Sequence, residues 1–208
     1  MNRVSIKPRG RPRSFDRERA LERAMRLFWL QGYEATSVSD LTRAMGINPP
    51  SLYAAFGDKE RLYLEAIGRY QRRRVESMAR WFEEEPTAQA AVRRLLTEAA
   101  CEPARPGAPR GSMLVFSAMQ YASEALQAKL AERRASMRAL LKRRIDRGVR
   151  ESELPRGTDS GSLTDFYSAV FQGMSIQAHG GATRKSLLAI AETAMRAWPG
   201  GRSAGERD

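Results

Sequence analysis

The first residues with a recognisable chemistry are arginines. The segment PRGRP, residues 8–12, places Arg9 and Arg11 on either side of Gly10, and Arg13 follows directly. Arginines that flank a small residue can enter a narrow A/T-rich minor groove, where the negative potential of DNA is strongest. The same residues would also suit a solvated basic tail without sequence preference. The chemistry expected of this arm is therefore anion binding.

Residue types that catalyse reactions or bind metals are scarce. Cys101 is the only cysteine and His179 the only histidine, which leaves almost nothing for zinc fingers, disulfide frameworks or Ser-His-Asp triads. The sequence also lacks a Gly-rich phosphate loop after a strand and a His-Glu-x-x-His motif. An enzyme would have to use scattered carboxylates such as those of residues 83–85, which are typical of a solvated helix end. We therefore expect no enzyme, no cofactor and no metal site.

The chain is strongly basic. Its 208 residues carry a formal net charge of +12, and residues 1–74, with sixteen Lys and Arg against eight Asp and Glu, account for +8 of it. This charge predicts a polyanionic partner, either nucleic acid or an acidic membrane surface. The basic stretches at residues 69–74 and 133–147 are spaced for a solvated face without an aromatic opposite side, which disfavours the membrane. No apolar run approaches the roughly 20 residues needed to cross a bilayer, so we expect a cytoplasmic protein.

Local signals predict a helix-turn-helix at residues 37–56. Ser37 and Asp40 are spaced as a capping box at the start of one short helix. That helix should end at Gly46, because glycine accepts the left-handed conformation of a tight turn. Asn48 can cap the next helix, whose first turn holds two prolines that need no amide partner there.

The remaining pattern predicts an all-α protein of about nine helices, because apolar residues recur at helical spacing and no segment alternates like a strand. The expected helices lie at residues 15–31, 38–45, 49–56, 59–81, 88–101, 113–121, 124–149, 162–178 and 185–198.

Residues 32–67 resemble the N-terminal domain of the TetR (tetracycline repressor) family. The resemblance rests on Gly32-Tyr33, Thr36-Ser37-Val38, Gly46-Ile47, Leu52-Tyr53-x-x-Phe56 and Lys59. Combined with the residue patterns, it predicts three parts: a flexible, AT-hook-like basic arm (1–13), a three-helix helix-turn-helix domain (14–74), and a helical effector-binding and dimerisation domain (75–208) with a disordered tail from about residue 200. The remaining two-thirds of the chain matches the family only in size, helical character and order.

The helical period predicts which residues face DNA. On the helix 49–56, Leu52, Ala55 and Phe56 share an inward face, which leaves the opposite face for the major groove. By the resemblance, Tyr53 and Lys59 donate to phosphates; otherwise Tyr53 packs between domains and Lys59 is solvated. The predicted DNA-binding residues are Arg9, Arg11, Arg13, Ser37, Ser39, Asn48, Pro49, Pro50, Ser51, Tyr53 and Lys59.

The recognition helix is poor in base-reading side chains. It has no Arg, Lys or Gln for bidentate contacts, and Asn48 is expected to serve as its cap. We therefore expect thymine methyl contacts, DNA shape and the basic arm to supply more of the specificity, with Arg9 and Arg11 in the minor groove and Arg13 on a phosphate. The arm assignment is an analogy with arms that precede other helix-turn-helix domains.

The C-terminal region yields only broad expectations. Methionine and aromatic side chains could line an apolar effector pocket or form an ordinary helical core. The expected pocket residues are Met113, Phe116, Met119, Tyr121, Phe166, Phe171 and Met174. The last two helices are apolar around so much of their circumference that they must be buried in the core or in a partner. By the resemblance they form a four-helix dimer interface with Tyr167, Val170, Met174, Leu188, Ala191 and Met195.

Taken together, these features predict a dimeric transcriptional regulator that binds double-stranded DNA at an inverted-repeat operator. The resemblance further implies a repressor that an unidentified small molecule releases from its operator. An enzyme with a helical fold and a basic membrane-surface protein are the alternatives, and neither has a motif to support it.

Overall fold

The computed structural model describes residues 15–101, 109–119 and 123–200, and within these ranges the chain folds into helices joined by turns. This confirms the predicted all-α class and the helix-turn-helix at residues 37–56. The helices are α1 (Arg17–Gln31), α2 (Val38–Met45), α3 (Pro49–Phe56), α4 (Lys59–Glu84), α5 (Ala88–Cys101), α6 (Met113–Phe116), the 3-10 helix η2 (Ser117–Met119), α7 (Glu124–Arg150), α8 (Ser160–His179) and α9 (Arg184–Arg196). None of the described helices combines the length and apolar character that a bilayer crossing requires.

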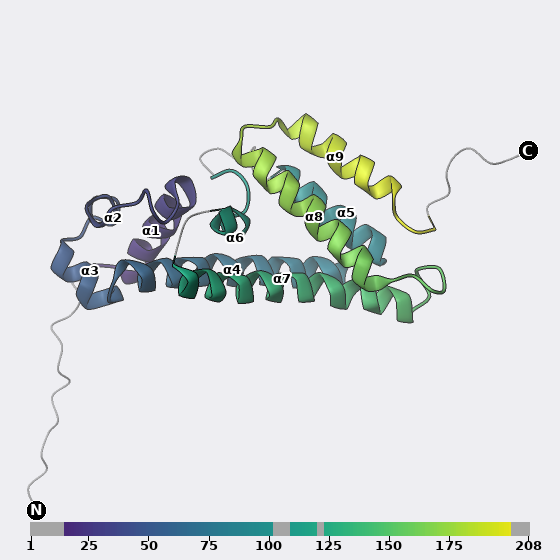
Figure 1. The fold of residues 1–208 in the computed structure, drawn as a ribbon, viewed down its shortest axis with the longest axis horizontal. Helices are drawn as coiled ribbons and strands as arrows, with labels where there is room; N and C mark the ends of the chain where they lie inside the picture. Colours follow the sequence, from purple (N-terminus) through teal and green to yellow (C-terminus); the bar gives the residue numbers. More distant parts are fainter. Residues whose placement is uncertain (1–14, 102–108, 120–122, 201–208) are drawn as a thin grey trace, which may run out of the picture.

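Two long helices form the spine of the molecule. Helices α4 and α7 run side by side, with α1, α2 and α3 at one end and α5, α8 and α9 packed at the other (Figure 1). The short helix α6 lies between these two groups and contacts α4, α7 and α8. The fold therefore places α6 where the two ends of the molecule meet.

Side-chain caps begin the N-terminal helices, and those at Ser37 and Asn48 are the predicted ones. The Asp16 carboxylate accepts a hydrogen bond from the Arg19 amide at 3.1 Å, and the Asn48 side chain accepts one from the Ser51 amide at 2.9 Å. Ser37 and Asp40 form the complete capping box of α2. Gly46 ends α2 with a φ of 71°, a conformation that costs an L side chain energy. Short-range chemistry thus fixes the turn between α2 and α3.

Two apolar cores stabilise the fold, and the N-terminal one is not closed by α1–α4 alone. Buried residues of those helices, such as Phe28 and Leu52, pack together with Met113 and Leu114 of α6 and with two leucines of α7, Leu126 and Leu130. We call this cluster the N-terminal core. Residues from distant parts of the sequence therefore complete the hydrophobic core of the helix-turn-helix.

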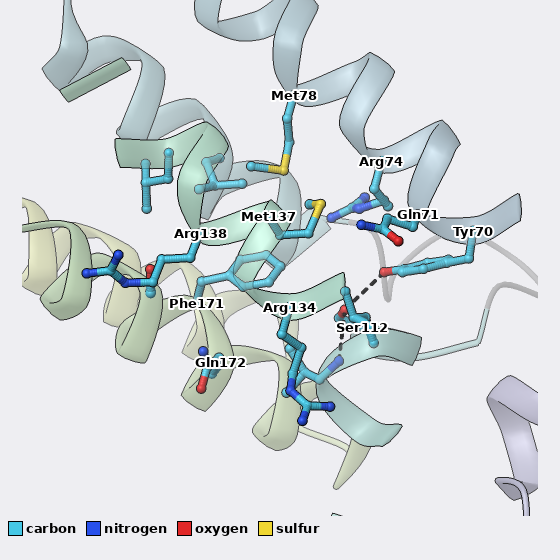
Figure 2. Close-up of a pocket in the computed structure, with 15 residues that line it drawn as sticks. Tyr70, Gln71, Arg74, Met78, Ser112, Arg134, Met137, Arg138, Phe171 and Gln172 are labelled. Atoms are coloured by element: carbon cyan, nitrogen blue, oxygen red, sulfur yellow. Dashed lines mark hydrogen bonds between the residues drawn. The ribbon is translucent and has the colours of Figure 1, made fainter. Parts of the chain in front are cut away.

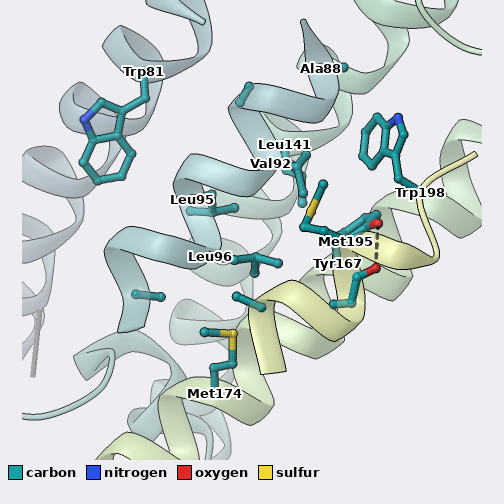
Figure 3. Close-up of a cluster of buried hydrophobic side chains, with 14 of the residues drawn as sticks. Trp81, Ala88, Val92, Leu95, Leu96, Leu141, Tyr167, Met174, Met195 and Trp198 are labelled. Atoms are coloured by element: carbon teal, nitrogen blue, oxygen red, sulfur yellow. Dashed lines mark hydrogen bonds between the residues drawn. The ribbon is translucent and has the colours of Figure 1, made fainter. Parts of the chain in front are cut away.

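The C-terminal core is formed by the end of α4 together with α5, α7, α8 and α9 (Figure 3). Tyr167 of α8 is fully buried in it and donates a hydrogen bond to the Ala194 carbonyl oxygen of α9 at 3.1 Å. Gly148 of α7 allows α5 to approach closely, because a Cβ at this position would lie 2.8 Å from the Cβ of Ala88.

A buried ion pair secures the same junction of α5 and α7. The guanidinium of Arg144 lies 3.3 Å from the Glu153 carboxylate, and the two side chains are only 3% and 13% exposed. Glu153 also accepts a hydrogen bond from the Ala88 amide at the start of α5. Removing the carboxylate would leave a buried charge and a helix-end amide without their partner.

We predict that Glu153→Ala lowers the free energy of unfolding by about 3 kcal/mol, because an unpaired buried guanidinium is costly. Urea denaturation followed by circular dichroism at a fixed protein concentration measures this loss. Glu151→Ala is the matched control, since Glu151 is exposed and pairs with the exposed Arg147 at 2.9 Å. An equal loss of stability in the two variants would contradict the role assigned to the buried pair.

Candidate nucleic-acid interface and ligand cavity

The predicted DNA-binding positions of the helix-turn-helix carry uncharged side chains. Leu52 and Phe56 of α3 are buried in the N-terminal core, as predicted, while Tyr53 is 50% exposed on the opposite side of the helix. Ser51 is half-buried, and the other predicted positions of α2 and α3 are exposed: Ser37, Ser39, Asn48, Pro49 and Pro50. Arg9, Arg11 and Arg13 lie outside the described residues.

Two of these polar groups already have intramolecular partners. The Asn48 side-chain oxygen accepts from the Ser51 amide, which leaves its NH₂ group as the free donor. The Ser37 hydroxyl and amide both donate to the Asp40 carboxylate, and these hydrogen bonds, with smaller help from Arg43, hold the pKa of Asp40 below its ordinary value. Ser37 therefore acts first as a cap.

Lys59 is held by an aromatic ring at the start of α4. Its Nζ lies 4.4 Å from the ring centroid of Tyr33, a distance that allows a cation–π interaction. The Tyr33 ring in turn packs against Tyr63 of the N-terminal core, with 4.9 Å between centroids. The Lys59 ammonium group therefore lies over the Tyr33 ring, and its phosphate contact stays a prediction. A second cation, Arg17 of α1, fixes α3 by pairing with Glu65 at 2.5 Å and covering the Phe56 ring at 4.4 Å.

Sequence reasoning missed two cations close to this surface. The side chains of Arg43 at the end of α2 and Arg61 in the first turn of α4 are 78% and 77% exposed. Each lies 3.5 Å from a helix-capping acid, Asp40 or Asp58. Such exposed pairs are weak, so both guanidinium groups can contact an external anion. Both arginines lie in helical turns next to predicted DNA-binding residues, and this position in the sequence could have indicated them.

A small cavity of about 70 Å³ opens among α4, α6, α7 and α8 (Figure 2). Apolar side chains cover most of its wall, and polar groups come chiefly from α4 and α7. The lining residues are Tyr70, Gln71, Arg74, Met78, Leu95, Ser112, Leu114, Val115, Arg134, Met137, Arg138, Leu141, Ser168, Phe171 and Gln172. We call this space the ligand cavity.

Of the expected pocket residues whose side chains the structure describes, Phe171 alone lines the ligand cavity. Met113 and Met174 are buried in the N-terminal and C-terminal cores, respectively. Phe116 packs against His179 with 3.8 Å between ring centroids and the ring planes tilted by 33°, and Phe166 is 43% exposed on α8. Tyr121 lies outside the described residues, as does the side chain of Met119.

The predicted interface also needs correction. Tyr167, Met174, Ala191 and Met195 are at most 3% exposed, because the apolar faces of α8 and α9 pack into the core of their own chain. Val170 and Leu188 stay half-buried at the surface. The exposed apolar side chains of α8 are instead Phe166 and Ile176, each 43% exposed.

Residues 109–117, here called the α6 segment, join the ligand cavity to the helix-turn-helix. The Trp29 indole of α1 donates a buried hydrogen bond of 3.0 Å to the Gly111 carbonyl oxygen, and the Tyr70 hydroxyl of α4 bonds Ser112 at 3.1 Å. On the other side, Gly111 approaches α8 so closely that a Cβ would lie 2.3 Å from the Ser175 carbonyl oxygen. The φ of 73° at Gly111 also favours glycine. The α6 segment is therefore fixed between α1 and α8.

Comparison with known proteins identifies the group to which these features belong. A sequence profile described as bacterial regulatory proteins of the tetR family matches residues 20–66. The chain is 35% identical to the HTH-type transcriptional repressor ComR of Escherichia coli K12 over 93% of both chains. It is 29% identical to the repressor BdcR of the same organism, over 90% of this chain and 91% of BdcR.

Solved structures agree with this assignment. The TetR family transcriptional regulator CifR, in a cysteine-substituted form complexed with 26-base-pair double-strand operator DNA, is 42% identical and superposes with a TM-score of 0.87. The match covers 91% of this chain and 100% of that structure. The chain therefore belongs to the TetR family of bacterial DNA-binding transcriptional regulators.

Proposed function

We propose that this protein is a dimeric repressor that binds an inverted-repeat operator and is released from it by a small-molecule effector. The observation that carries the proposal is the exposed surface of α2 and α3, with Lys59 fixed beside it by Tyr33. The relatives named as repressors, and the operator complex of CifR, support this reading. Exposed parts of α3 would enter the major groove, while Lys59, Arg43 and Arg61 would bind phosphates. We propose that the basic arm, residues 1–13, also contacts the operator DNA.

A duplex selected from a random DNA pool by the purified protein provides the operator for testing this proposal. We predict that Lys59→Gln weakens binding to it and lowers the slope of log affinity against log salt concentration by about 0.9, because one phosphate contact is lost. Fluorescence anisotropy at several salt concentrations measures this slope.

Lys185→Gln is the matched control, because Lys185 is exposed on α9 and the charge change is the same. Equal slopes for the two variants would contradict the phosphate contact. Failure of the wild-type protein to enrich an inverted repeat would contradict the proposed function as a whole.

The surface of α8 supports the proposed dimer. Phe166, Val170, Gly173 and Ile176 recur at three-to-four spacing on its outer side, and all are exposed or half-buried. A Cβ at Gly173 would meet no atom within 4 Å in this chain, although glycine inside a helix costs about 0.5–1 kcal/mol relative to alanine. A second α8 crossing at close range would explain why a residue without a side chain lies there.

We predict that Gly173→Leu shifts the protein toward monomers, because the new side chain prevents the close helix crossing. Sedimentation velocity over a range of concentrations measures the shift. Ala135→Leu, on the exposed side of α7, adds a leucine away from the proposed interface and should leave the oligomeric state unchanged. A Gly173→Leu protein with the wild-type association constant would contradict the α8 interface.

The α6 segment offers a route for effector release. Ser112, Leu114 and Val115 form part of the wall of the ligand cavity, and the neighbouring Gly111 accepts the hydrogen bond from Trp29 of α1. A ligand that displaces this wall would disturb α1, on which the helix-turn-helix packs. Effector and operator would then favour different positions of the same segment, which is the basis of negative coupling between two sites.

A further inference from the structure

The ligand cavity has a charge that its apolar wall does not explain. Arg74, Arg134 and Arg138 line it, and the described lining residues include no Asp or Glu. Figure 2 shows Arg74 on α4 beside Met137, and Arg138 directed away from Phe171. Arg138 binds the Asp165 carboxylate at 2.6 Å, outside the cavity wall. Arginines without an acidic neighbour in the cavity wall favour a ligand that carries negative charge.

Arg134 has an unsatisfied donor at this site. Its Nη1 atom is buried and has no hydrogen-bond partner among the described residues. Burial also lowers the pKa of the Arg134 guanidinium, because it disfavours the charged form. The preceding arginine differs: Nη1 of Arg133 donates to the Gln71 side-chain oxygen at 3.0 Å. A buried donor without an acceptor is costly, and an oxyanion supplied by a ligand would remove that cost.

We propose that the ligand cavity binds an organic acid, a carboxylate carried on an apolar body. The carboxylate accepts from Nη1 of Arg134, and the body packs against the apolar part of the cavity wall. This inference rests on the proposed function, because it names the chemical class of the effector. Primary amines are excluded by repulsion from the Arg134 guanidinium. The cavity of about 70 Å³ favours compact acids, and longer ones require the walls to move.

Isothermal titration calorimetry with matched probes tests the inference. The probes are butanoate, hexanoate, octanoate and benzoate, each compared with the primary amide and the primary amine on the same skeleton. We expect at least one carboxylate to bind about tenfold or more tightly than its amide, because a charge-assisted hydrogen bond is lost in the amide. We expect no measurable binding of the amines.

Arg134→Met should abolish the preference for the acid over the amide, because methionine keeps an apolar stem and removes the charge. Arg133→Met is the matched control one position earlier and should keep the preference, since Arg133 does not line the cavity. If Arg134→Met does not fold, as judged by circular dichroism, Arg134→Lys retains a positive charge and should retain a preference that Arg134→Gln loses.

Equal binding of acid and amide, an acid preference that persists without the Arg134 charge, or no binding of any carboxylate would each overturn the inference. Operator binding is measured on the same preparation. A protein that binds its selected operator but no carboxylate would refute the ligand class and leave the DNA-binding function standing. A protein that binds carboxylates as expected but no operator would refute the proposed function alone.

Discussion

The hydrogen bond from the Trp29 indole to the Gly111 carbonyl oxygen joins parts of the chain that are 82 residues apart. It is buried, and on its far side Gly111 lies against the backbone of α8 with no room for a side chain. Because Met113 and Leu114 of the same segment pack into the N-terminal core, the helix-turn-helix cannot be packed independently of the rest of the fold. This arrangement constrains both the DNA-reading surface and the ligand cavity.

One structural element thus serves two sites. The α6 segment lines the ligand cavity through Ser112, Leu114 and Val115, and it contacts α1 through Gly111. Interfaces of this kind have discrete packing arrangements and do not deform continuously, because protein interiors are close-packed. In the proposed regulator, a ligand would therefore select a different position of the segment, and operator DNA would select the position described above.

The predictable parts of the fold were those that local chemistry determines. The caps at Asp16, Ser37 and Asn48, and the left-handed Gly46, each depend on atoms a few residues away, so the sequence predicts α1, α2 and α3 closely. The orientation of Leu52 and Phe56 followed from the helical period. The cation–π contact of Lys59 with Tyr33 could not be predicted from spacing, because it requires the tertiary position of α4.

The ligand cavity was not predictable for a related reason. Composition favoured methionines and aromatics as pocket residues, but Met113 and Met174 fill the two cores. Arginines 134 and 138 lie on a long charged helix whose pattern indicates a solvated face, and only the crossing of α4, α6, α7 and α8 brings them to a cavity. Likewise, the sequence pattern of the apolar faces of α8 and α9 fits burial against a partner or burial in their own chain. Packing with α5 buries Tyr167 and Ala191 in the C-terminal core of their own chain.

The central claim is that the α6 segment links the cavity to the helix-turn-helix through Trp29. Hydrogen–deuterium exchange of residues 109–117, with and without saturating operator duplex, tests it directly in the wild type and in Trp29→Phe, which keeps a large ring but removes the indole donor. The account predicts that the operator slows exchange in this segment of the wild type, because coupling is reciprocal, and that Trp29→Phe loses most of this protection while α2 and α3 remain protected. Unchanged exchange in the wild type, or equal protection in the variant, would contradict the account.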